Sequence, residues 1–116
     1  MGVPLLHLMS SDRLSQLRAM LQDEPGDPFL RYAIALELNR GGAREQACKD
    51  LEALVREAPD HVPSYYQLAS ILVDLGRTSD AIEVCDAGSL QCIVSGDRKT
   101  RGELLALKET IEEVDP

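Results

Sequence analysis

The sequence predicts an all-α fold of about six helices that run antiparallel and stack as pairs. Two observations predict it. In residues 62–88, apolar side chains recur at steps of three and four on either side of a glycine, which is typical of two amphipathic helices joined by a tight turn. Displaced by 34 residues, the sequence also matches itself, which predicts an equivalent helix pair upstream. Neither helix can bury its apolar side alone, and so the pairs must stack.

The self-match keeps small and apolar residues in register. The identical pairs are Tyr32 and Tyr66, Ala35 and Ala69, Leu38 and Leu72, Gly42 and Gly76, Ala47 and Ala81, and Ala53 and Ala87. One period earlier, Leu17 and Pro25 fall on Leu51 and Pro59, which predicts a truncated repeat before the first complete one. A period of 34 residues is typical of repeats built from helix pairs.

The two complete repeats resemble the tetratricopeptide repeat (TPR) family. Its pattern is W-x2-L-G-x2-Y, then A-x3-F, then P. Here the pattern appears as Arg31-x2-Ile34-Ala35-x2-Leu38, Ala47-x3-Leu51 and Pro59, and in part as Tyr65-x2-Leu68-Ala69-x2-Leu72 and Ala81-x3-Cys85. The chain departs from the pattern in lacking the tryptophan, in carrying alanine for glycine, and in lacking the second closing proline. The layout is similar to that of short, stand-alone bacterial TPR proteins, and it implies a right-handed superhelix.

In order along the chain, the first expected element is a flexible arm. The expected segments are the arm at residues 1–10 and a single TPR domain at 11–116, made of a half-repeat at 11–25, a repeat at 27–59, a repeat at 61–94 and a capping helix at 98–114. The half-repeat should hold a helix over residues 12–22, capped by Ser11, that buries Leu17 and Met20 on one face.

The remaining helices follow from caps and breakers. Asp27 can cap a helix over residues 28–40, and a helix over 43–57 should follow the glycines at 41 and 42. After the helix that starts near residue 61, Ser79 can cap the next one. Gly88 lies inside that helix, where it predicts a close approach of two backbones or, alternatively, a hinge. The final helix should bury a stripe of apolar residues, namely Leu104, Leu107, Ile111 and Val114.

The composition excludes several classes of function. The chain has 116 residues, of which 44% are hydrophobic and 28% charged, so we expect one folded domain. The net charge of −8 disfavours binding to nucleic acid or to an anionic membrane surface. Three cysteines without paired spacing argue against a disulfide framework, and we expect a cytoplasmic protein.

Catalytic and metal-binding patterns are missing from the sequence. The only histidines are His7 and His61, and neither stands in a catalytic motif. We therefore expect no catalytic residues, no metal and no cofactor. A metal or thiol site at Cys85 and Cys92, which lie seven residues apart, is a remote alternative, since buried free cysteines more often pack as small apolar residues.

The resemblance implies a function in protein binding. In the family, the first helices of the repeats line a concave groove that commonly binds a segment of a partner protein. Carried over position by position, this implies a groove formed by Phe29, Tyr32, Leu36, Asn39, Arg40, Tyr66, Ser70, Val73, Asp74, Leu105 and Glu109. Packing between adjacent helices is an equal alternative for Tyr32 and Tyr66.

The groove residues also suggest what it would bind. Apolar residues with acidic neighbours such as Asp74 and Glu109 suit a basic-apolar protein or peptide segment. Self-association through Leu105 or the groove, giving a homo-oligomer, is the competing expectation. The apolar residues 3–9 of the arm could also lie in the groove and compete with a partner.

Overall fold

The computed structural model describes residues 5–114, with side chains from residue 12 onward, and within them it is entirely helical and turn. Its six helices are α1 (Leu5–Asp23), α2 (Pro28–Arg40), α3 (Arg44–Glu57), α4 (Pro63–Asp74), α5 (Thr78–Ser95) and α6 (Arg98–Val114). The predicted all-α fold of six helices is confirmed.

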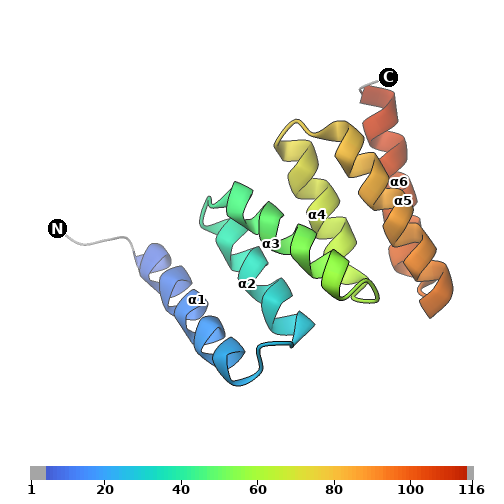
Figure 1. The fold of residues 1–116 in the computed structure, drawn as a ribbon. Coiled ribbons are helices and arrows are strands. Elements are labelled where there is room, and N and C mark those ends of the chain that lie inside the picture. Colours follow the sequence, from blue (N-terminus) through green and yellow to red (C-terminus); the bar gives the residue numbers. More distant parts are fainter. Residues whose placement is uncertain (1–4, 115–116) are drawn as a thin grey trace.

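The helices form a row in chain order, as Figure 1 shows. Each helix packs on the next one along the chain, and α4 additionally packs on α6. The pairs α2–α3 and α4–α5 are the two complete repeats. Helix α1 corresponds to the second helix of a repeat, and α6 corresponds to the first helix of a repeat. The stack therefore ends in a half-repeat on each side.

Small residues lie where neighbouring helices approach most closely. Ala35, Ala47, Ala69 and Ala81 are all completely buried. They are among the positions that the 34-residue self-match keeps identical, and a larger side chain there would push two helix axes apart. Larger aliphatic residues fill the space between these contacts, and the most deeply buried are Leu51, Leu54, Leu68, Ile71, Leu72 and Leu104.

Glycine and aspartate set the helix ends. Gly42 and Gly76, one period apart, have φ values of 94° and 77°, a left-handed conformation that glycine adopts without steric cost. Asp27 accepts a hydrogen bond from the backbone N–H of Phe29 at 2.9 Å, so its predicted capping role is confirmed. Ser79 is not a cap. Helix α5 already begins at Thr78, and no side chain caps it.

The N-terminal prediction is wrong in its boundary. Helix α1 begins at Leu5 rather than at residue 12, so Ser11 lies within the helix and residues 5–10 belong to it rather than to a flexible arm. The physical reason is that no glycine or proline interrupts residues 5–23, and a possible cap does not stop a helix that can continue. Residues 1–4 lie outside the described part of the chain.

Two predicted core residues at the ends of the stack are exposed. Met20 on α1 is 54% exposed, and Val114 on α6 is 81% exposed. Met20 is equivalent to the buried Leu54, which the first helix of its own repeat covers, but α1 has no such helix. Val114 lies at the end of α6, and no further repeat among the described residues covers it. Of the other predicted residues of α6, Leu104 and Ile111 are buried as expected, and Leu107 is half-buried and packs against the core.

No helix in the described part of the chain is both long and apolar enough to cross a membrane.

Candidate functional site

The candidate site is the surface that α2, α4 and α6 turn away from the core, which we call the inner-helix face. Its residues are Phe29, Tyr32, Leu36, Asn39 and Arg40 on α2, Tyr66, Ser70, Val73 and Asp74 on α4, and Leu105 and Glu109 on α6. Every one of them is exposed or half-buried, whereas the opposite side of each helix is buried. The 3.6-residue period of a helix explains this division, because residues at steps of three and four share a side.

Tyr32 connects the first helices of the two repeats. Its ring lies against that of His61, at the start of α4, with ring centroids 5.3 Å apart and tilted by 58°. Burial raises the pKa of the Tyr32 hydroxyl, and a side-chain hydrogen bond with Gln67 on α4 opposes this increase. Tyr32 therefore contributes to packing between α2 and α4, which is the alternative role that the sequence left open.

Apolar side chains are accessible along the inner-helix face. Phe29, at the start of α2, is 65% exposed, and Leu105 on α6 is 39% exposed. Tyr66 and Val73 are half-buried and pack against the core with one side. Leu36 on α2 is half-buried as well. A partner could thus contact apolar groups supplied by all three helices.

The charged groups leave this face acidic. Asp74 and Glu109 are exposed. Arg40 is the cation of the face, but its Nη1 lies 3.4 Å from the carboxylate oxygen Oε1 of Glu37. Glu37 is shared with Arg13, so Arg40 keeps its charge, and the two exposed carboxylates of the face outnumber this single cation.

Glu37 is a buried carboxylate that sequence reasoning missed. Its side chain is 4% exposed, and its Oε1 lies 3.0 Å from Nε of Arg13 on α1 and 3.4 Å from Arg40. Its Oε2 is buried and has no hydrogen-bond partner among the described residues. The signal was available, because Glu37 is one period before Ile71, a fully buried core residue. Glu37 links α1 to α2 at the cost of one unsatisfied oxygen.

The cysteines are all free and buried. Burial raises the pKa of Cys85 to about 11, and burial likewise raises the pKa of Cys48 and of Cys92. The thiolate is the reactive form of cysteine, so these thiols are unreactive at neutral pH. Among the described residues, no group of three or more histidine, cysteine or acidic side chains is arranged to hold a metal ion.

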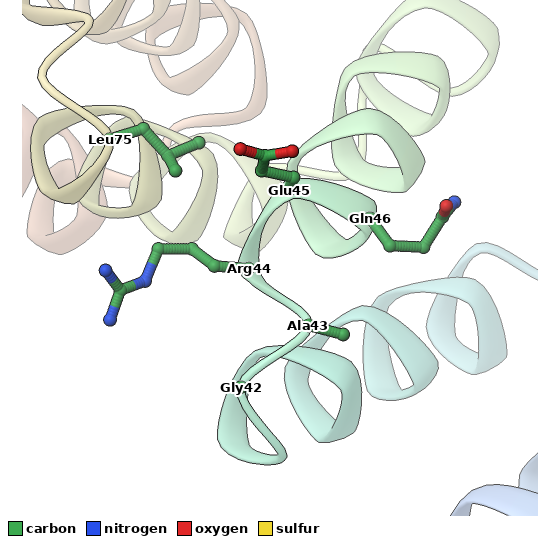
Figure 2. A pocket seen from close by; sticks show the side chains of 6 residues that line it. All are labelled: Gly42, Ala43, Arg44, Glu45, Gln46 and Leu75. Atoms are coloured by element: carbon green, nitrogen blue, oxygen red, sulfur yellow. The ribbon is translucent and has the colours of Figure 1, made fainter.

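A shallow depression of about 520 Å³ lies between the α2–α3 turn and the end of α4. Gly42, Ala43, Arg44, Glu45, Gln46 and Leu75 line it. Figure 2 shows that the side chains of Arg44 and Gln46 point in different directions rather than toward one another. A ligand site needs polar groups that converge on one point, and this depression does not provide them.

Comparison with known proteins decides the family. No protein-family model and no curated protein matches the chain. Among solved structures, a tetratricopeptide repeat domain protein from Salinibacter ruber, determined by NMR, is 35% identical, and the match covers 78% of this chain and 92% of that one with a TM-score of 0.75. A crystal structure of a TPR domain protein from the same organism gives 35% identity, 77% and 99% coverage, and a TM-score of 0.73.

This chain belongs to the tetratricopeptide repeat family. The resemblance that the sequence indicated is therefore confirmed. A more distant TPR structure, the TPR2B domain of yeast Sti1 in complex with pHsp70, is 16% identical, and the match covers 90% of this chain and 83% of that one with a TM-score of 0.82. At that identity, the likeness concerns the fold alone.

The outer side of α5 carries exposed apolar residues that sequence reasoning also missed. Leu90, Ile93 and Val94 are 65%, 58% and 84% exposed. They lie off the stripe of buried residues that includes Cys85 and Cys92, and this was visible in the sequence. They were missed because only the buried residues of this helix were considered.

Proposed function

We propose that this TPR protein is a non-catalytic interaction module that binds a basic-apolar segment of a partner protein on its inner-helix face. The observation that carries the proposal is the exposure of Phe29 at one end of that face, because an aromatic side chain 65% open to water stands beside further accessible apolar groups. Aromatic residues of this kind are common anchors of binding energy in protein interfaces.

The Sti1 structure supports the class of partner. A chain with the same fold is there in complex with pHsp70, so a TPR stack of this size is able to hold a segment of another protein. The acidic character of the inner-helix face favours a segment with Lys or Arg beside its apolar anchors. Asp74 and Glu109 would meet those cations at the rim, where charges act mainly on the rate of association.

The chemistry of the side chains argues against catalysis. His61 Nδ1 and Ser64 Oγ lie 2.8 Å apart, which is the distance of a nucleophile and its base. Ser64 is completely buried at the start of α4, however, so no substrate can reach its hydroxyl. The three thiols are buried and protonated, as described above. The buried, free cysteines also suit the reducing environment of the cytoplasm, where we propose that the protein acts.

A peptide-binding measurement tests the proposal. A library of short peptides with leucine or phenylalanine anchors, flanked either by Lys or by Glu, would be titrated with the protein and followed by fluorescence anisotropy. We expect the Lys-flanked peptides to bind at least about tenfold more tightly than the Glu-flanked ones. Affinity should fall only modestly between about 0.1 and 0.5 M salt, because apolar contacts are insensitive to screening.

Two variants with equally exposed apolar residues provide the control. Phe29→Ser removes the anchor on the inner-helix face, and Leu90→Ser removes a side chain of the same 65% exposure from the outer side of α5. We expect Phe29→Ser to weaken peptide binding about tenfold and Leu90→Ser to leave it unchanged. Equal effects of the two variants, or selection of Glu-flanked peptides, would contradict the proposal.

A further inference from the structure

The apolar residues on the outer side of α5 form one continuous patch. Ala87, Leu90, Ile93 and Val94 are all exposed, and their steps of three and four residues place them on the same side of the helix. The buried residues Cys85, Gly88 and Cys92 lie on the opposite side, toward α4 and α6. We call these four exposed residues the α5 patch. It faces away from the core and is separate from the inner-helix face.

The α5 patch is not a requirement of the repeat. Helix α3, the equivalent helix of the first repeat, has 14 residues, whereas α5 has 18. The residue equivalent to Leu90 is the exposed Arg56, and the positions equivalent to Ile93 and Val94 are Pro59 and Asp60, beyond the end of α3. The extra turn of α5 is therefore apolar where the first repeat is polar or not helical. Exposed apolar surface of this kind commonly marks a protein interface.

Charges of opposite sign lie at the two ends of the α5 patch. Glu83 precedes it on the same side of α5, is exposed and makes no ion pair among the described residues. Beyond its other end, α6 begins with Arg98, Lys99 and Arg101, which are likewise exposed. Asp97 caps the same helix end by accepting hydrogen bonds from the backbone N–H and the hydroxyl of Thr100 at 3.0 and 2.8 Å, but the three cations outnumber it and leave this end of α6 positive. An acidic group of a second molecule would be attracted to this end.

We propose that the α5 patch is the interface of a homodimer in which the α5 helices of two copies pack antiparallel about a two-fold axis near Leu90. Along this surface the residues change from acidic through apolar to basic. A second copy running in the opposite direction therefore presents the complementary charge at each end. Glu83 lies seven residues before Leu90, about 10 Å along the helix, and Arg98 lies just past the other end of α5, at the start of α6. In the antiparallel arrangement, Glu83 of one copy meets the start of α6 of the other, and the apolar residues meet each other.

The size of the patch sets the expected strength. Four apolar side chains cover less than the roughly 800 Å² per partner of a standard stable interface. We therefore expect a reversible dimer, with a dissociation constant in the micromolar range. Because the α5 patch and the inner-helix face lie on different sides, both copies in the dimer would keep a free inner-helix face.

The experiment is sedimentation equilibrium from about 1 µM to about 1 mM protein, a range that brackets such an affinity. The native chain should change from monomer to dimer mass, and Leu90→Ser with Val94→Ser should remain monomeric, with a helical circular dichroism spectrum showing that it folds. Phe29→Ser, with the same exposure as Leu90, should dimerise like the native chain. A native chain that stays monomeric throughout, or dimerisation that Phe29→Ser abolishes and the Leu90 variant does not, would overturn the proposal.

A charge exchange tests the antiparallel arrangement itself. Glu83→Arg should weaken the dimer at least about tenfold, since it places like charges together at both ends of the interface. Adding Arg98→Glu to the same chain should restore most of the affinity, because the exchanged charges again face each other across the two-fold axis. A double variant as weak as Glu83→Arg alone would show that a second copy does not dock in this way.

Discussion

Gly88 offers a direct test of how closely the helices pack. A Cβ atom at this position would lie 2.7 Å from Tyr65 Cβ, 2.8 Å from Tyr65 Cγ and 2.8 Å from Leu104 Cδ1. Carbon atoms in contact are normally about 3.5–4.0 Å apart, so every one of these distances is about 1 Å too short. Tyr65 Cβ and Cγ lie next to the backbone of α4 and cannot move aside alone. In Gly88→Ala, α5 would have to shift away from α4 and α6.

The magnitude follows from two opposing effects. Overpacking of a core costs about 1–3 kcal/mol, while alanine in a helix interior is favoured over glycine by about 1 kcal/mol. We therefore expect the free energy of unfolding to fall by up to about 2 kcal/mol in Gly88→Ala. For a domain of this length, the melting temperature should fall by up to about 8 °C. Thermal unfolding followed by circular dichroism, with urea titration for the free energy, measures both.

Gly102 supplies the matched control. It also lies inside a helix, α6, but a Cβ there would have no heavy atom within 4 Å. Gly102→Ala should therefore show only the helix-propensity effect and raise stability by about 0.5–1 kcal/mol. If Gly88→Ala were as stable as Gly102→Ala, the close packing of α5 against Tyr65 would be refuted, and the hinge would again account for Gly88.

Three further predictions concern stability. Ala69→Leu, at a completely buried position, should cost about 1–3 kcal/mol in a urea titration, whereas the exposed Lys49→Gln should change the result by less than about 0.5 kcal/mol. Glu37→Leu should be at least as stable as the native chain and more stable than Glu37→Gln, because it removes the unpaired buried oxygen while both arginine partners stay in contact with water; a large loss in Glu37→Leu would contradict this. Burial lowers the pKa of His61 below its usual 6.5, so the unfolded chain binds a proton at a higher pH than the folded one. Stability should therefore fall as the pH drops from about 6.5 toward the folded pKa, and His61→Gln should lack this part of the pH dependence.

The fold was predictable because the pattern of a helix pair lies within about 34 consecutive residues and occurs twice in the chain. Ala35 and Ala69, or Gly42 and Gly76, carry the same packing or turn requirement at a distance of 34 residues, so the sequence alone indicated the helix pairs and their register. The residues of the inner-helix face were chosen by the same register, and each of them is exposed or half-buried, with Tyr32, Tyr66 and Val73 also packed against the core. Binding at this face is a separate question, which the peptide measurement addresses.

Where sequence reasoning failed, the missing information was which neighbour covers a given side of a helix. Met20 and Leu54 occupy equivalent positions in an equally apolar stripe, but only Leu54 has a first helix over it. Glu37 stands at a core position, and only the tertiary structure shows that Arg13 reaches it from α1.

Periodicity determined which residues share a side of a helix in this protein. The contacts between helices decided which of those sides are buried. Leu90 and Val94 are left exposed because no further helix of the described residues packs on the outer side of α5. Tyr32 is partly covered because His61 and Gln67 lie beside it. Burial depends on residues distant in the chain, and a pattern within one helix contains no information about them.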